Sequence, residues 1–370
     1  MKICYLANAA SIHTMRWAKY FASKGHNVHL ISPETSGENA IENVNLHLVT
    51  MSRHLILHCD PIRIRRLIKQ IKPDILHAHY ILGYGLLGAL SGFHPFILSV
   101  WGSDVLAAPK NSRLAKLEVK FALRKADMVT AQAEFMGNFL KNEFKLPQSK
   151  FMRIPWGTDL SVFHRGYEGD VIKLRGDLEI SENSSVILSN RNMAPEYEIG
   201  GIIDTVPHVV HKCPNAIFVF LRGNGTEKFE DEMKSRAEKL GVMGNVRFIP
   251  KLIASKEMAV YLNMADAFMS IPRYGQFGIS ILEGMACGAI PILSNIAVHK
   301  ELVVNNESAL LVDPENPEEI AGKISYCIEH PELRDRFYRI NKGIVEEKED
   351  WDKNAKEMEK LYERLVSKNN

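Results

Sequence analysis

The chain has 370 residues, 46% of them hydrophobic and 24% charged, and a formal net charge of only +2. This composition supports a sizeable core and excludes a wholly disordered chain, while 24 Gly and 16 Pro exclude collagen-like and low-complexity sequences. The length predicts two domains. Five Cys without a C-x-x-C pair argue against a disulfide framework or a thiolate zinc site and favour a reducing compartment.

The first half alternates short apolar or β-branched runs with stretches of helical periodicity. The expected strands are 2–8, 27–32, 44–51, 75–79, 96–101, 128–131 and 151–156. The expected helices are 13–24, 61–71, 83–90, 112–125 and 133–142. Such alternation predicts a parallel sheet with helices on both faces.

The same pattern restarts after residues 159–184, a Gly- and Glu-rich stretch without strong periodicity that we interpret as a linker. The expected strands are 186–189, 217–221, 246–249, 267–271, 290–294 and 309–312. The expected helices include 199–210, 227–240, 256–264 and 278–286, followed by charged helical sequence over 317–368. We therefore predict an α/β protein with two Rossmann-like domains facing one cleft, and ligands at the carboxyl ends of the strands.

Charge is distributed unevenly along the chain. Residues 1–165 hold 21 Lys and Arg against 11 Asp and Glu, whereas the remainder holds 25 against 33. Much of the excess lies in two segments with helical periodicity, 60–72 and 110–125. Basic amphipathic helices bind anionic membrane surfaces, and the alternative is an ordinary solvated helix. Aromatic residues do not interleave with these charges, so we expect no nucleic acid partner.

No membrane-spanning or secretory segment is expected. The longest apolar stretch, 81–100, is divided by several glycines and by a His-Pro pair into pieces too short to cross a bilayer. The apolar run at residues 1–10 is explained better by a first strand than by a signal peptide. We expect a cytoplasmic protein, with peripheral contact to the inner face of the plasma membrane through the basic segments.

Two loops carry small residues where a ligand could approach the backbone. Ala9, Ala10 and Ser11 follow the first strand, beside a helix N-terminus where phosphate can meet N–H groups. There is no G-x-G-x-x-G, so a dinucleotide site lacks its fingerprint. Gly223, Asn224 and Gly225 lie between a strand and a helix. They suit a ligand contact and equally suit any tight turn.

The segment 272–288 is more informative. A strand ends at Ile271 and a helix begins near Gly278, so the first-turn N–H groups can bind an anion such as a diphosphate. Glu283 shares a helix face with Ile279. A carboxylate there can accept hydrogen bonds from both hydroxyls of a ribose, although a buried helix with a Glu near its cap explains the pattern equally well.

The run 277–294, followed by Glu301 and 309–312, resembles the donor-site signature of family 4 glycosyltransferases. Further similarity lies in four shorter segments, namely 12–17, 25–28, 101–104, and 154–159 with Phe163. The resemblance covers about residues 3–330. It implies the GT-B fold, in which a C-terminal helix crosses back to the first domain. We assign residues 1–165 to an acceptor-side domain and 166–349 to a donor-binding domain, and expect a helix at about 350–370 to pack on the former.

The resemblance also implies roles for individual residues. Arg191 matches the arginine that faces the donor diphosphate, and Glu283 matches the glutamate that holds the donor ribose. Backbone contacts to the donor are implied at Ala9, Ala10, Ser11, Ile249, Phe277, Gly278, Ile279 and Ser280. Three positions depart from the family pattern. Gly275 replaces the first Glu of a pair, Tyr197 replaces a diphosphate-binding Lys, and Trp101 replaces a frequent His.

Several polar residues of the first half are candidates for the acceptor side. His13 begins a helix, where it could contact substrate or act in a cap, and Asp104 could belong to the active site or cap the following helix. His77 and His79 share one face of a strand. A cleft-lining or core role fits them better than a metal site, because no third ligand is evident. We assign His13 and Asp104 with Arg191 and Glu283 to catalysis. The acceptor-side residues are His79, Trp101 and Gly102.

Together these features predict a hexosyltransferase that moves a sugar from a nucleotide-diphosphate donor to a hydroxyl acceptor. The resemblance implies retention of anomeric configuration, with no metal and no cofactor beyond the donor itself. The basic first half favours a lipid-linked or glycan acceptor, as in cell-envelope polysaccharide or glycolipid assembly. Two alternatives remain open at this point, a GT-B nucleotide-sugar epimerase or phosphorylase and a non-catalytic GT-B protein that binds a nucleotide or glycan.

Overall fold

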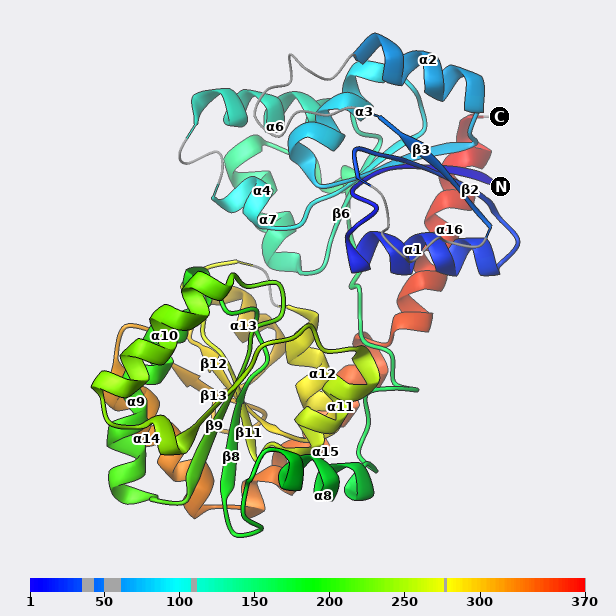
Figure 1. Cartoon of the computed structure of the whole chain (residues 1–370). Helices are drawn as coiled ribbons and strands as arrows, with labels where there is room; N and C mark the ends of the chain where they lie inside the picture. The colour runs from blue at the N-terminus through cyan, green and yellow to red at the C-terminus, as the bar shows by residue number, and fades with distance from the viewer. Residues whose placement is uncertain (35–42, 50–60, 108–111, 276–277, 370) are drawn as a thin grey trace. The chain divides into compact units, whose positions relative to one another are not determined.

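The structure is a computed structural model that describes residues 1–34, 43–49, 61–107, 112–275 and 278–369. The chain forms two compact units (Figure 1). Unit 1 comprises Met1–Pro155 and Lys353–Asn370, and unit 2 comprises Trp156–Asp352. The first domain was predicted to end at residue 165. The structure assigns 156–165 to unit 2, where Phe163 is buried and Arg165 Nη1 donates to Asp335 Oδ1 at 2.6 Å.

Within the described residues, unit 1 is built on a seven-stranded sheet of order β3-β2-β1-β4-β5-β6-β7, with every neighbouring pair parallel. Its strands are β1 (Lys2–Leu6), β2 (Asn27–Ser32), β3 (Val44–Leu48), β4 (Ile75–His79), β5 (Phe96–Ser99), β6 (Met128–Ala131) and β7 (Phe151–Arg153). The central strands are buried on both faces, as in parallel sheets covered by helices. The strand order reverses between β1 and β4, where doubly wound sheets bind ligands.

Helices cover both faces of this sheet (Figure 1). One face packs against α2 (Pro61–Ile71), α3 (Leu86–Ser91), α6 (Arg113–Lys125) and α7 (Glu134–Phe144). The other face packs against α1 (Ile12–Ser23) and the unit 1 part of α16 (Trp351–Asn369). Two short elements follow strand ends. The turn Ile81–Gly85, in which Leu82 and Gly83 have non-helical backbone angles, follows β4, and α4 (Ser103–Leu106) follows β5.

The last helix is joined to the middle of the sheet by a buried chain of hydrogen bonds. Tyr362 Oη lies 3.0 Å from Tyr5 Oη and 2.6 Å from His77 Nδ1. The chain continues from His77 Nε2 to Ser99 Oγ at 2.8 Å and from Ser99 Oγ to Thr130 Oγ1 at 2.6 Å. Every polar atom named here has a partner in a region without water access, which makes the position of α16 specific.

Unit 2 contains, among the described residues, a six-stranded parallel sheet of order β10-β9-β8-β11-β12-β13. The strands are β8 (Ser185–Ser189), β9 (Ala216–Leu221), β10 (Val246–Ile249), β11 (Ala267–Ser270), β12 (Ile290–Ser294) and β13 (Leu310–Val312). The order reverses between β8 and β11. Both units therefore have the predicted Rossmann-like topology, and in unit 2 the loops after β8 and β11 flank the reversal.

The helices of unit 2 also lie on both faces of its sheet (Figure 1). The core on one face includes side chains of α9 (Ile199–Lys212), α10 (Glu227–Lys239) and α14 (Pro317–Glu329). On the other face α12 (Ile279–Cys287) approaches β11 closely, because Gly284 has no side chain to meet the Phe268 ring. The remaining helices are α8 (Glu168–Asp177), α11 (Ser255–Met264), α13 (Ala297–Leu302) and α15 (Glu332–Lys348).

The stretch 159–184, which shows no strong periodicity and was interpreted as a linker, contains regular structure. It contains α8, a helix in which no residue is fully buried. Because α8 has no fully apolar face, the periodicity that reveals a helix in a sequence is absent. No helix of the described residues is long and apolar enough to cross a membrane.

Candidate functional site

The candidate site residues lie at the carboxyl edges of the two sheets. In unit 2, Arg191 follows β8, Gly223 follows β9, and Gly278 lies in the loop that connects β11 to α12. In unit 1, Ala9 follows β1 and His79 is the last residue of β4. These are the edges at which doubly wound sheets bind ligands, so the topology brings the predicted residues of each unit to one edge.

The Arg191 guanidinium is held at the N-terminus of α12. Its Nη1 donates to Ser280 Oγ at 3.0 Å, and its central carbon lies 4.2 Å from the centre of the Tyr197 ring. A Cβ on Gly278 would lie 1.7 Å from Arg191 Nη1. The absence of a side chain at Gly278 is therefore what allows the guanidinium to reach the helix end.

This arrangement concentrates positive charge. The N-terminus of an α-helix has the equivalent of about half a positive charge and several unsatisfied N–H groups. Among the described residues no side chain caps α12 at Gly278. A guanidinium beside such an end is repelled by the helix dipole, so the place is suited to a ligand with at least one full negative charge. An anionic group bound at this end of α12 would neutralise both the guanidinium charge and the positive end of the helix dipole.

Neighbouring loops support the segment that carries Arg191. Asn190 is buried, and its Nδ2 donates to Ser280 O at 2.8 Å, which ties the end of β8 to α12. Asn192 Oδ1 accepts from Asn224 N at 3.2 Å. A Cβ at Gly223 would lie 2.3 Å from Asn192 Oδ1, and one at Gly225 would lie 2.3 Å from Met193 O. The two glycines thus let the loop after β9 pack on the loop after β8.

The other predicted donor residues of unit 2 occupy the same edge. Glu283 is half-buried on α12, four residues after Ile279. Ile249 ends β10, and its carbonyl accepts from Arg222 N at 3.0 Å, so this carbonyl is already paired. Ile279 and Ser280 form the first turn of α12. Phe277 lies outside the described residues.

The small-residue loop of unit 1 uses its own N–H groups internally. Ala9 N donates to Ser32 Oγ at 2.9 Å, Ala10 N to Asn8 Oδ1 at 2.7 Å, and Ser11 N to Asn8 O at 3.2 Å. The loop is therefore at the expected edge, but in this structure its three amides hydrogen bond within the protein instead of remaining open to a phosphate.

An aromatic cluster lies at the ends of β4 and β5. The Trp101 ring is 5.8 Å from the His13 ring, 6.0 Å from the His79 ring and 6.2 Å from the Tyr80 ring, between centroids. His79 is 1% exposed, and neither ring nitrogen has a hydrogen-bond partner among the described residues. Burial lowers the pKa of His79 to about 3, and the charge of His13 acts in the same direction. His79 is therefore neutral at physiological pH.

Asp104 is fully buried and acts on the backbone around it. Its carboxylate accepts hydrogen bonds from the backbone N–H groups of Ile81 at 2.9 Å, Trp101 at 3.1 Å and Gly102 at 2.8 Å. Burial raises the pKa of Asp104 to about 6, while these hydrogen bonds oppose the rise. Gly102 has φ +108°, which favours glycine. The contacts of Asp104 are thus those of a residue that positions the Trp101–Gly102 turn.

The three departures from the family pattern each have a structural setting. Gly275 has φ +134°, a conformation that side-chain-bearing residues rarely adopt, so a glutamate would be strained there. Tyr197 faces Arg191, and Trp101 is surrounded by aromatic rings. The backbone at residue 275 is suited to glycine, and the side chains of Tyr197 and Trp101 make contacts of their own. None of the three replacements therefore simply removes one contact.

Sequence reasoning missed several residues at these edges. Tyr80 has φ +76° immediately after β4, and Asn190 holds Ser280 O. His299 is fully buried beside β12, where its Nδ1 lies 2.8 Å from Ser294 O; burial lowers its pKa to about 4, with a smaller effect from the charge of Arg191. A polar residue directly after a predicted strand was the available signal for Tyr80 and Asn190. The sequence contained no such signal for His299, because this residue lies five positions after the end of its strand.

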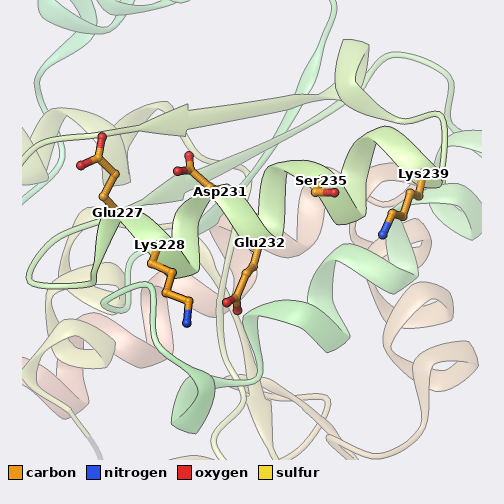
Figure 2. Close-up of a pocket in the computed structure, with 6 residues that line it drawn as sticks. All are labelled: Glu227, Lys228, Asp231, Glu232, Ser235 and Lys239. Carbon is orange, nitrogen blue, oxygen red and sulfur yellow. The ribbon is translucent and has the colours of Figure 1, made fainter.

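A hollow of about 650 Å³ on unit 2 does not coincide with these residues. It lies along α10 and is lined by Glu227, Lys228, Asp231, Glu232, Ser235 and Lys239 (Figure 2). All its lining residues belong to one helix. Across the described parts of the chain, no group of three His, Cys, Asp or Glu converges as metal ligands would.

Comparison with known proteins identifies the family. Residues 170–358, more than half of the chain, match the family described as glycosyl transferases group 1. The chain belongs to this glycosyltransferase family. Residues 2–133 match the family described as glycosyl transferase 4-like. The family predicted from the residues around Gly278 is thereby confirmed.

Individual relatives of this glycosyltransferase are distant but cover its length. An uncharacterised glycosyltransferase of Methanocaldococcus jannaschii is 24% identical, over 91% of this chain and 90% of the relative. The N-acetyl-α-D-glucosaminyl L-malate synthase of Bacillus anthracis is 20% identical, over 89% and 87%. The crystal structure of Anabaena HepE in complex with UDP-glucose matches with a TM-score of 0.85 at 17% identity, over 99% of this chain and 100% of that chain.

Proposed function

We propose that this glycosyltransferase takes its sugar from a nucleoside-diphosphate-sugar and that unit 2 binds the diphosphate. The observation that carries the proposal is the Arg191 guanidinium held beside the N-terminus of α12, which no side chain of the described residues caps. A diphosphate has the negative charge needed to neutralise Arg191 and the α12 N-terminus. The planar N–H donors of a guanidinium also match the spacing of phosphate oxygens. The UDP-glucose complex of HepE supports the same class of donor. Glu283 would hold the donor ribose, and the first-turn amides of Ile279 and Ser280 would face the β-phosphate.

In the proposed reaction the bond between the anomeric carbon and the β-phosphate oxygen breaks, and a bond forms between that carbon and the acceptor oxygen. The acceptor proton passes to the departing phosphate, so no separate base is needed. Arg191 and the α12 amides stabilise the charge that develops on the leaving diphosphate. This preorganised charge does the work that a metal ion would do elsewhere, and we propose a retaining, metal-independent hexosyl transfer. In unit 1, His13 and Trp101 would contact the acceptor, and Asp104 would position the turn that carries Trp101.

Thermal unfolding with UDP, GDP, ADP, dTDP and the corresponding glucose conjugates, in EDTA, tests the donor class. A ligand at 100 times its Kd adds about 2.7 kcal/mol to stability, a shift of a few degrees. We expect the diphosphates and sugar conjugates of one base to give the shift. Arg191→Ala should remove the shift, whereas the exposed control Lys173→Ala, on α8, should retain it. A shift that appears only with added Mg²⁺ would contradict metal independence. No shift with any compound would contradict the donor site.

The same donor then separates transfer from the alternative activities. Consumption of the sugar nucleotide only when a hydroxyl acceptor is supplied supports transfer, and the anomeric configuration of the product by NMR tests retention. Conversion of the sugar nucleotide without acceptor would indicate an epimerase, and consumption that needs inorganic phosphate a phosphorylase. Donor binding without consumption across an acceptor screen would indicate a non-catalytic protein.

We also propose that unit 1 binds an anionic membrane, where a lipid-linked or glycan acceptor of cell-envelope assembly would be found. On α6, Leu114 and Leu117 are 61% and 64% exposed, and Phe121 is 36% exposed. Their spacing places them on one face, opposite the buried Val119 and Ala122. The flanking basic residues of α6 are Arg113, Lys116, Lys120, Arg124 and Lys125. Most of these cations lie along one side of the apolar stripe, and Glu118 lies on the other side. An apolar stripe with an excess of cations beside it suits the interface of an anionic bilayer.

A neighbouring helix extends this basic surface. α3 packs against both α2 and α6 on one side of the unit 1 sheet (Figure 1). On α2, Ile62 is 61% exposed next to the exposed side chains of Arg63, Arg65, Arg66 and Lys69. Each Lys or Arg near an anionic surface contributes about 1 kcal/mol. The two helices together would therefore bind anionic lipid more strongly than either alone.

Vesicle flotation tests this surface. We expect binding to phosphatidylcholine vesicles that contain 30% phosphatidylglycerol and little binding to pure phosphatidylcholine. Changing Leu114, Leu117 and Phe121 to Ser should weaken binding by at least about ten-fold, because each buried large side chain contributes about 1.5–3 kcal/mol. Leu252→Ser, at a position 66% exposed in unit 2, is the matched control. Equal binding to both vesicle types would reject the proposal.

A further inference from the structure

Tyr197 stands out among the residues around Arg191 because it presents a ring where a second cation was expected. It ends the short 3₁₀ helix Pro195–Tyr197, which follows β8. The Arg191 guanidinium lies over the ring, with its central carbon 4.2 Å from the ring centre. At this distance the ring attracts the cation through its electron-rich face.

The ring is itself held in place from two sides. Tyr197 is half-buried against the unit 2 core that includes α9 and α14. The next residue, Glu198, forms an ion pair with Arg273 in the loop after β11, with Nε and Oε1 2.6 Å apart. Arg273 Nη1 also pairs with Glu315. The segment that carries Tyr197 is therefore tied to the loop that leads into α12.

These contacts restrict the guanidinium in two directions. The centre of the Tyr197 ring lies 4.2 Å from the guanidinium's central carbon, and Ser280 Oγ accepts a hydrogen bond from its Nη1 at 3.0 Å. Because the cation–π contact and the hydrogen bond act on the same group, rotation of the guanidinium away from the helix end would break both of them. Its other N–H groups keep a fixed direction, and preorganised donors lose less entropy when they bind an anion.

We propose that Tyr197 is a positioning residue for the diphosphate site, which holds the Arg191 guanidinium by a cation–π contact and does not supply a second positive charge. The proposal rests on the proposed function, since it requires that Arg191 binds the donor diphosphate. In the family pattern an arginine and a lysine bind the diphosphate together. In this protein one arginine, held by the Tyr197 ring, would bind it alone. The diphosphate should then be bound with weaker dependence on salt than by two cations.

Calorimetric titration with UDP, GDP, ADP and dTDP identifies the diphosphate that binds most tightly, and its nucleoside serves as the ligand without phosphate. We expect Tyr197→Phe to bind within about two-fold of the wild type, because the ring remains. Tyr197→Leu should bind about 2- to 30-fold more weakly, the range of one cation–π contact. Nucleoside affinity should be unchanged in both. Tyr326→Leu, at an exposed tyrosine of α14, is the matched control.

A double-mutant cycle separates positioning from general damage to the fold. In the Arg191→Ala background, Tyr197→Leu should have no further effect on diphosphate affinity, because there is no guanidinium left to orient. An equal loss in both backgrounds, or a loss of nucleoside affinity as well, would overturn the proposal. Tyr197→Lys should steepen the salt dependence, and an unchanged dependence would count against it too.

The outcomes also distinguish the two proposals. If none of the four diphosphates binds the wild type, or if Arg191→Ala binds as tightly as the wild type, the proposed donor site fails and the role of Tyr197 with it. If Arg191→Ala loses affinity while Tyr197→Leu retains it, only the role of Tyr197 is rejected.

Discussion

Tyr362 Oη lies 2.6 Å from His77 Nδ1, and this contact joins residues 285 positions apart in the chain. It sets the last helix against the fourth strand, in the interior of unit 1. The same hydroxyl meets Tyr5 Oη at 3.0 Å, and the Tyr362 ring stacks on Phe21 with centroids 5.0 Å apart. The last turns of the chain are thus part of the first unit's core, and removing them should unfold it.

Replacing Tyr362 with Phe tests this junction with little change in shape. The variant leaves the Tyr5 hydroxyl and His77 Nδ1 buried without their shared partner, and each such group costs about 1–3 kcal/mol. We expect the free energy of unfolding of unit 1, measured with urea, to fall by at least about 1 kcal/mol. Tyr326→Phe, on α14 of unit 2, should change nothing. Equal stability of Tyr362→Phe and the wild type would show that the hydrogen bonds are dispensable.

Acid should destabilise the protein through buried neutral histidines. Burial lowers the pKa of His77 well below its usual value, that of His79 to about 3 and that of His299 to about 4. Below pH 6.5 the unfolded chain therefore binds more protons than the folded protein, and stability falls as pH falls, by up to about 1.4 kcal/mol per pH unit for each group. Asp104, whose pKa is raised to about 6, contributes in the opposite sense between about pH 4 and 6.

A variant isolates one of these contributions. His79→Phe removes a buried titratable ring that has no hydrogen-bond partner among the described residues. The free energy of unfolding, measured by urea at intervals from pH 7 to pH 4.5, should fall less steeply for this variant than for the wild type. An identical slope in both proteins would mean that His79 is protonated in the fold or is not buried.

Gly278→Ala should impair the donor site without unfolding the protein. Gly278 has φ −77° and ψ 150°, which alanine adopts readily, but the new Cβ would lie 1.7 Å from Arg191 Nη1 and would displace the guanidinium. We expect at least about ten-fold weaker binding of the preferred nucleoside diphosphate, equivalent to loss of one charge-assisted hydrogen bond. The melting temperature should stay within about 2 °C.

The control for this variant is Gly244→Ala, where an added Cβ meets no atom within 4 Å. It should bind the nucleoside diphosphate like the wild type. Undiminished affinity in Gly278→Ala would mean that Arg191 is not required at the helix end, and would count against the proposed donor site itself.

Asp104→Asn tests the positioning of the Trp101 turn. Asparagine keeps the shape of the side chain but replaces one acceptor oxygen with an NH₂ group. This NH₂ group would face buried backbone N–H groups that now donate hydrogen bonds to the Asp104 carboxylate. We expect a loss of about 1–3 kcal/mol of stability in the unit 1 transition. Asp231→Asn, at a position on α10 where the side chain is 66% exposed, is the matched control and should change stability little. A variant as stable as the wild type would show that the turn does not depend on the carboxylate.

The sequence predicted the parallel sheets well because strands buried on both faces read as short apolar runs between amphipathic helices. It failed at α8, which has no buried face to produce a periodic pattern. For the candidate site, the residue types and their place after strand ends were available, so Arg191 and Gly278 could be named. Tyr197 and Ser280 were named as well, but their contacts with Arg191 could not be predicted, because these side chains meet it only where separate loops come together.

The sequence by itself determined the family, the two-sheet topology and the carboxyl edges at which the candidate residues lie, since periodicity and local motifs are properties of neighbouring residues. Only the tertiary structure decided how those residues are used. In the folded chain the amides of Ala9, Ala10 and Ser11 form hydrogen bonds within the protein. Asp104 is buried and accepts hydrogen bonds from backbone N–H groups, and the Tyr197 ring contacts Arg191. Hydrogen bonds and burial depend on groups brought together from distant parts of the chain, and a linear pattern does not contain those distances.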